Sequence, residues 1–334
     1  MTVTDAFLFA AEAVFPIVLL IVLGYMLKRR GMLTKPFLDV GNKLTFRVLL
    51  PVMLFCNVYK IDRLSDVNVA FVLYGIGAVI ILFLAAIAVC CAFTKDNAKR
   101  GSLIQSVFRS NYAIIGIPLA ASLFGDKGAA AAGVMSAFCV PTFNILGVIT
   151  LVIFNGNEEK QKADIKKIFL GVVKNPLIIG TVTGLAVLGI REIFVKTGIS
   201  FRLSDVTVLF KTLENIKSIC TPLALIVLGG KFEFSAVSRL RREIIFGTLV
   251  RTVAVPVIGL GTALLLKNTM SLSGEHFATY MGVFATPVAV ASAIMAKEMG
   301  ADDELAGQLV VWTSLVSTVT IFIYVTALRI IGIF

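Results

Sequence analysis

Long apolar runs alternate with short polar connections from one end of the chain to the other. A membrane-spanning helix needs about 20 mostly apolar residues, and ten runs reach that length. The ten runs lie at residues 7–27, 37–58, 67–93, 101–124, 127–154, 168–190, 205–230, 243–266, 276–299 and 303–331. This pattern predicts an all-α integral membrane protein with ten transmembrane helices.

The composition supports this class of protein. Of the 334 residues, 58% are hydrophobic and only 15% are charged, and the mean hydropathy is +0.94. Soluble domains carry about 25% charged residues, so an ordinary soluble domain is excluded. We expect membrane lipid to cover the outer surface of the protein.

The net charge of +11 follows the order of the loops. The loops after the odd-numbered runs hold 16 lysines and arginines, whereas the other loops and the chain ends hold 8. Because short cytoplasmic loops are enriched in basic residues, this bias predicts that the first set of loops is cytoplasmic. Both termini are then outside, in a multi-pass protein of the cell (inner) membrane. The charge reflects topology, and we expect no nucleic-acid partner.

Three prolines in the first half of the chain have counterparts in the second half. Pro16, Pro51 and Pro118 correspond to Pro176, Pro222 and Pro287, at offsets of 160, 171 and 169 residues. Five runs separate the matched elements, and because five is odd the second copy has the opposite orientation in the membrane. We therefore expect two inverted five-helix repeats, residues 1–154 and 168–334, joined by a cytoplasmic linker at residues 155–167.

The fourth and ninth runs contain glycine and proline near their middle. Proline removes a backbone donor and clashes with the preceding turn, so we expect breaks at residues 111–118 and 284–287 that cross near mid-membrane. Opened backbone is tolerated in a membrane only where it faces protein or a water-filled cavity. Paired interruptions of this kind mark the substrate sites of secondary transporters. The pattern therefore favours a transporter over an enzyme.

Each break is expected to start a half-helix. Thr286 is predicted to cap a half-helix that begins at Pro287 and ends at Gly300, and Pro118 to open one that ends at Gly125. The positive ends and free N–H groups of both half-helices would then meet at mid-membrane. Such ends favour an anion, most simply a carboxylate.

The residues beside the breaks are the candidate substrate ligands. These candidates are Arg109, Ser110, Asn111, Gly116, Pro118, Thr286 and Pro287, with Arg251 and Asn175 in support. Arg109 lies ~12 Å into its run at ~1.5 Å per residue, a depth at which an arginine needs a partner. It either pairs with a substrate carboxylate or bonds the exposed carbonyls of the break. Asn111 is expected to touch or support the substrate, and Arg251 to form a structural pair. Asn175 is expected to start a helix together with Pro176.

The sequence predicts no metal or cofactor site. Its five cysteines lie inside apolar runs without metal-ligand spacing and are expected to act as small apolar side chains. The acidic cluster from Asp302 to Glu304 is expected to cap the tenth helix and to stabilise its dipole. No central run carries an unpaired Asp or Glu at mid-depth, and the coupling ion stays open.

Several stretches, in this order and spacing, resemble the auxin efflux carrier family over essentially the whole chain. They are Pro16 to Tyr25, Lys28 to Gly31, Val48 to Pro51, Asn111 to Leu119, Asn175-Pro176 and Gly300 to Gly307. The family includes plant PIN auxin exporters and bacterial carriers for malonate or malate. The chain departs from the plant pattern at one point, because Thr286 rather than asparagine precedes Pro287.

The resemblance implies a scaffold of helices 1, 2, 6 and 7 beside a transport bundle of helices 3–5 and 8–10. The bundle would move like an elevator, with crossed broken helices 4 and 9, and the scaffold would form a homodimer. The implied substrate is a small organic anion, a mono- or dicarboxylate that is auxin-like or malate/malonate-like. A sodium-coupled organic-anion symporter of the bile-acid symporter type shares this logic and is the alternative. The direction of transport stays open.

Overall fold

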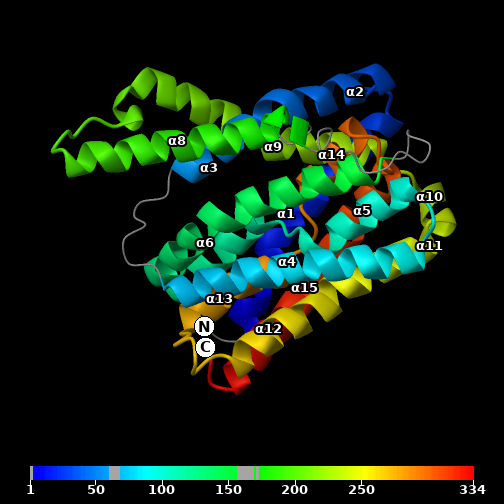
Figure 1. Ribbon diagram of the computed structural model, residues 1–334. Coiled ribbons are helices and arrows are strands. Elements are labelled where there is room, and N and C mark those ends of the chain that lie inside the picture. Colours follow the sequence, from blue (N-terminus) through cyan, green and yellow to red (C-terminus); the bar gives the residue numbers. More distant parts are fainter. Residues whose placement is uncertain (1–2, 60–67, 156–168, 171–172) are drawn as a thin grey trace.

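The computed structural model describes residues 3–59, 68–155, 169–170 and 173–334 (Figure 1). Within these ranges the regular secondary structure is helical, and no strand forms beyond one isolated β-bridge. The all-helical fold is therefore confirmed. The predicted linker lies outside the described residues except for Asn155. So do six of the loop cations counted above, Lys60, Arg63, Lys160, Lys162, Lys166 and Lys167.

Six helices of the described chain are long and apolar enough to cross a membrane. They are α4 (Val69–Phe93), the stretch Tyr112–Ile153, which contains α6 (Ile117–Ile153) with its kink at Phe124–Gly125, α8 (Pro176–Lys196), α9 (Thr207–Lys231), the stretch Arg241–Leu265 and α15 (Asp303–Ile330). The remaining predicted runs fall on α1 (Val3–Arg29), on α2 (Lys35–Leu44) with α3 (Leu50–Tyr59), on α5 (Asn97–Phe108) with the first part of α6, and on α13 (Gly274–Phe284) with α14 (Val290–Glu298). The membrane class follows, while the count of ten spans stays a prediction.

Capping side chains and glycines that can be read from the sequence set where several helices begin and end. Asn175 caps α8, because its side-chain oxygen accepts from the N–H of Leu177 at 2.9 Å, and this confirms its predicted role. Asp302 caps α15 in the same way through the N–H of Leu305 at 2.8 Å, as predicted. Gly125 (φ +57°) and Gly300 (φ +76°) take left-handed conformations where the two half-helices end, again as predicted.

Three prolines do not break their helices but follow a π-helix. The π-helices are η1 (Thr45–Leu49), η2 (Tyr112–Gly116) and η4 (Val250–Ala254), which is followed by α12 (Val255–Leu265), and the prolines are Pro51, Pro118 and Pro256. The widened turn moves away the carbonyl that the proline ring would strike, so the helix continues. In η2 the N–H of Ile117 donates five residues back to Tyr112. The predicted break at residues 111–118 is therefore wrong in its extent, since residues from Tyr112 onward are helical.

The helices divide into two groups by their packing. In the first group, α1 packs along α9, and α3 packs on α8 and α9. In the second group α4 packs on α5, α6 on α13, and α15 on α11 (Arg241–Leu249) and α14. Figure 1 shows α2, α3, α8 and α9 as a layer along one side of the remaining helices. α1 of the first group also packs along α15 of the second. The groups coincide with the helices of the implied scaffold and bundle, but repeat symmetry and relative movement stay predictions.

Gly116 lies where α13 crosses the start of α6. A Cβ atom added to Gly116 would lie 2.9 Å from the Cα atom of Gly282, and one added to Gly282 would lie 2.8 Å from that of Gly116. Only two glycines allow this approach of the backbones. The structure thus uses Gly116 for packing between helices.

We expect Gly116→Ala and Gly282→Ala each to destabilise the protein by about 1–3 kcal/mol, because each methyl group would enter the opposite backbone. Gly133→Ala in α6 is the matched control, since nothing lies within 4 Å of its added Cβ. Thermal unfolding of the purified protein in detergent measures the difference. Equal midpoints for Gly116→Ala and Gly133→Ala would contradict the close crossing.

Candidate functional site

The two broken segments cross as a short antiparallel pair. The N–H of Asn111 donates to the carbonyl of Pro287 at 2.8 Å, and the N–H of Ala289 donates to the carbonyl of Arg109 at 3.3 Å. These bonds enclose the isolated bridge between Ser110 and Val288. The crossing is therefore present, with non-helical backbone at residues 109–111 and 285–289. The second break overlaps its predicted position at residues 285–287, whereas the first overlaps only at Asn111.

Arg251 satisfies the carbonyl ends of both helices that stop at the crossing. Its Nε donates to the carbonyl of Thr286 at 2.8 Å, and its Nη2 donates to that of Val283 at 3.1 Å. Its Nη1 donates to the carbonyl of Val107, at the end of α5, at 3.0 Å. The last carbonyls of a helix lack partners within that helix and carry partial negative charge. The fully buried guanidinium of Arg251 thus ties two negative helix ends together, which is the structural role expected of it.

The prediction that Thr286 caps the second half-helix is wrong. Its hydroxyl donates to the carbonyl of Gly282 at 2.7 Å and so belongs to the last turn of α13. The half-helix α14 begins only at Val290, because the residues before it pair with the other broken segment. The N–H of Val288 within the break donates to the hydroxyl of Thr313 in α15 at 3.1 Å.

The amino ends of the two half-helices have no side-chain cap and border a small deep cavity. Asn111 precedes η2, and Ala289 precedes α14, and neither supplies a capping side-chain bond. The first turns of both half-helices line the cavity, whose volume is about 60 Å³. Free N–H groups and positive helix ends therefore converge on this space, and such an arrangement favours an anion.

Three of the predicted site residues line this cavity, namely Arg109, Ser110 and Asn111. The others lie elsewhere. Gly116 packs against Gly282, and Pro118 is exposed. Thr286 and Pro287 are buried in the crossing and do not line the cavity. Arg251 bonds the helix ends, and Asn175 caps α8. Pro118 points outward because the π-helix before it keeps the helix intact.

Arg109 is buried and donates to three side chains. Its Nη1 contacts Oε1 of Gln105 at 2.9 Å and the sulfur of Met295 at 2.6 Å, and its Nη2 contacts Oδ1 of Asn144 at 2.7 Å. These partners of Arg109 are side chains and not carbonyls of the break, so the expected bonding of the exposed carbonyls is not what these contacts show. Its charge still borders the cavity.

Sequence reasoning missed Asn144, Gln105 and Ser292 near the crossing. Asn144 lines the cavity, and all three are buried with a side-chain nitrogen or hydroxyl that has no hydrogen-bond partner. The nitrogen of Asn111 and the hydroxyl of Ser110 are in the same condition. The signal that could have found the missed residues is an amide in the middle of an apolar run, where polar groups are costly.

A larger vestibule of about 420 Å³ adjoins the deep cavity, because Ala224 and Ile294 line both. It lies at the end of α1 and the start of α15, where Lys28 and Asp303 line it. Across it Asn42 of α2 donates to Oε1 of Glu298 in α14 at 2.8 Å. This bond joins the two groups of helices beside the vestibule.

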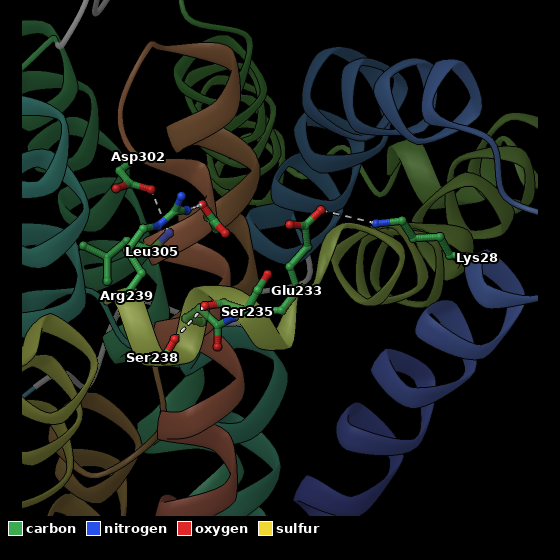
Figure 2. A network of polar contacts seen from close by, with 9 residues as sticks. Lys28, Glu233, Ser235, Ser238, Arg239, Asp302 and Leu305 are labelled. Carbon is green, nitrogen blue, oxygen red and sulfur yellow. Dashed lines mark hydrogen bonds and ion pairs between the residues drawn. The ribbon is translucent and has the colours of Figure 1, made fainter. Parts of the chain in front are cut away.

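The short helix α10 (Phe234–Arg239) stands at the rim of the vestibule between α9 and α11 (Figure 2). Glu233, just before it, forms an ion pair with Lys28 of α1 at 3.7 Å, and Arg239 at its end pairs with Glu304 of α15. The amide nitrogen of Gln308 also donates to the carbonyl of Glu233 at 2.9 Å. α10 is thus attached to both groups of helices.

Among the residues that the structure describes, no group of histidine, cysteine or acidic side chains could hold a metal ion.

We expect Arg251→Lys to lower stability by roughly 2–4 kcal/mol, because one ammonium cannot reach carbonyls on two helices and buried carbonyls lose their donors. Thermal unfolding in detergent measures the loss. Arg329→Lys, at an exposed arginine, is the control and should change little. An unfolding temperature for Arg251→Lys equal to that of the control would show that the bonds of Arg251 to the helix ends do not stabilise the protein.

Comparison with known proteins agrees with this architecture. A family model described as "Membrane transport protein" matches residues 9–325. The chain is also similar to a protein of Methanothermobacter thermautotrophicus described as an uncharacterized transporter, with 23% identity over 328 residues that cover 94% of this chain and 97% of the relative. The match extends over nearly the whole sequence, including both broken segments. The chain therefore belongs to the auxin efflux carrier family of membrane transport proteins.

Proposed function

We propose that this protein is a secondary transporter of a small organic anion, which binds at the crossing of the broken helices. The observation that carries the proposal is the positive charge and the unpaired hydrogen-bond donors on the wall of the deep cavity. Arg109 brings a positive charge, and Ser110, Asn111 and Asn144 bring unpaired donors. A buried donor without a partner costs about 1–3 kcal/mol, and the oxygens of a carboxylate would satisfy several at once.

The rest of the cavity wall favours a single carboxylate over two. Its other described residues are apolar apart from Thr221: Leu50, Met53, Leu54, Tyr112, Ala113, Ile114, Val140, Phe143, Leu177, Cys220, Ala224, Ala289, Val290, Ala291 and Ile294. A second carboxylate would meet this wall without a cation, and an unpaired buried charge is strongly unfavourable. We therefore favour a monocarboxylate with an apolar part over a malate-like dicarboxylate.

Alternating access by an elevator movement is the mechanism that we propose. The cavity lies between the two groups of helices, since α3, α8 and α9 line it on one side and α6 and α14 on the other. A bundle that slides along the scaffold would carry the crossing with it and would have to break the bond between Asn42 and Glu298. The sodium-coupled symporter remains the alternative, and dependence of uptake on external sodium would favour it.

The loop charges and the vestibule support one orientation in the cell membrane. Lys28, Lys35 and Lys231, which belong to the predicted cytoplasmic set, line the vestibule. The start of α1 and the end of α15 lie together at the opposite end of the helical body (Figure 1). We propose that the structure is open to the cytoplasm and that both termini are outside.

A homodimer through the first group of helices would cover polar side chains that lipid tolerates poorly. Lys43, Arg47 and Lys211 are exposed on the neighbouring elements α2, η1 and α9. Arg47 stands twelve residues after Lys35, ~18 Å along the helix at ~1.5 Å per residue. A lipid-facing arginine at that depth costs ~2.5–3.5 kcal/mol on insertion scales, so a partner subunit is favoured there.

Binding of carboxylates to the purified protein tests the function. We expect butyrate to raise the unfolding temperature more than succinate, and Asn111→Ala to weaken butyrate binding by ~1–3 kcal/mol with the fold intact, because one polar contact is lost. Asn268→Ala, in the loop after α12, is the control. A preference for cationic ligands, or an Asn111→Ala variant with the affinity of the wild type, would refute this assignment.

A reporter fused to Phe334 tests the orientation. We expect a periplasmic signal, because the loop charges place the C-terminus outside. A fusion after Lys95, in the loop between α4 and α5, should give the opposite signal. If the reporter at Phe334 is active in the cytoplasm, the proposed topology is wrong.

Light scattering in detergent tests the dimer. We expect a mass of two chains for the wild type and of one chain for Arg47→Glu, since a reversed charge would disturb the covered surface. Arg329→Glu, which lies outside the first group of helices, should keep the mass of the wild type. A single-chain mass for the wild type would exclude this assembly under the same conditions.

A further inference from the structure

The contacts of Arg109 with Asn144 and Gln105 fix the orientation of both side-chain amides. Arginine carries five N–H donors and no acceptor, so an amide that touches the guanidinium must present its oxygen. Arg109 touches Asn144 at 2.7 Å and Gln105 at 2.9 Å. The NH₂ group of each amide must then point away from Arg109.

The NH₂ group of Asn144 has no partner and belongs to a residue that lines the deep cavity. The side chain of Asn144 is 2% exposed and stands on α6, across from the crossing. Its Nδ2 is one of three unpaired buried donors on the cavity wall, with the side chains of Ser110 and Asn111. The cavity therefore holds an amide whose donor end is fixed before any ligand arrives.

Gly147 leaves the space that this arrangement needs. It lies one turn after Asn144 on α6, and a Cβ atom there would lie 2.9 Å from Nη1 of Arg109 and 3.3 Å from Oε1 of Gln105. A methyl group at Gly147 would displace the flexible end of Arg109. It would change no charge and no residue of the cavity wall.

We propose that Asn144 binds the substrate carboxylate through its NH₂ group and that Arg109 is a positioning residue that orients this amide. The carboxylate is then held by amide and hydroxyl donors, and Arg109, which bonds the oxygen of Asn144, adds a positive charge at the cavity wall. This inference rests on the proposed function and assigns the contacts within the same site. It separates the orienting role of Arg109 from that of a direct counter-ion.

A cycle of two charge-neutral substitutions tests the proposal. Binding of butyrate to the purified protein would be measured by calorimetry for the wild type, Asn144→Ala, Gly147→Ala and the double variant. We expect each single variant to lose about tenfold or more in affinity, the value of one hydrogen bond to a charged group. The double variant should be no weaker than Asn144→Ala alone, because both changes remove the same oriented donor. Gly133→Ala on the same helix is the control for an added methyl group.

Each other outcome identifies what has failed. Butyrate affinity unchanged in Asn144→Ala overturns the contact, and multiplied losses in the double variant overturn the orienting role of Arg109. Arg109→Lys gives a further reading, since it keeps the charge and loses the planar fork. It should weaken binding as much as Asn144→Ala, and retention of the wild-type affinity would make Arg109 a simple point charge. If the wild type binds no carboxylate, the proposed function falls and this inference falls with it.

Discussion

Backbone that opens inside an apolar layer must find partners for every N–H and carbonyl group that leaves a helix. At the crossing two helices stop, and their carbonyl ends and amino ends are treated differently. The carbonyl ends meet the guanidinium of Arg251, and the extended residues between them pair with each other and with Thr313. The amino ends receive no side-chain cap and face the cavity. Because the amino ends are uncapped, their N–H groups remain available at the cavity.

The sequence predicts much of this fold because its strongest signals are local. Apolar runs of sufficient length, an Asn-Pro pair at Asn175 and an acidic start at Asp302 each act within a few residues, and the helices begin where these signals stand. Gly125 and Gly300 end their helices for the same reason. The inverted repeat depends on relations between distant elements, and it stays a prediction.

The sequence predicts the site less well than the fold, because a proline does not always break a helix. Pro118 is preceded by a π-helix that removes its clash, whereas the true break begins at Arg109, where no proline stands. The exact limits of the second break depend on pairing with the first, which a single segment cannot reveal. The role of Asn144 could not be found from the sequence, because its bond to Arg109 joins residues that stand thirty-five positions apart.

The attachment of α10 to both groups of helices sets a limit on any displacement between them. Between α9 and α11 the chain has only Phe232 to Leu240, and its six helical residues rise ~1.5 Å each, against ~3.3 Å each when extended. Unwinding α10 would therefore lengthen this connecting segment by roughly 11 Å. The two ion pairs at its ends shorten the reach further while they last. Any displacement between the two groups would thus be limited by a connection that contacts neither the deep cavity nor the crossing.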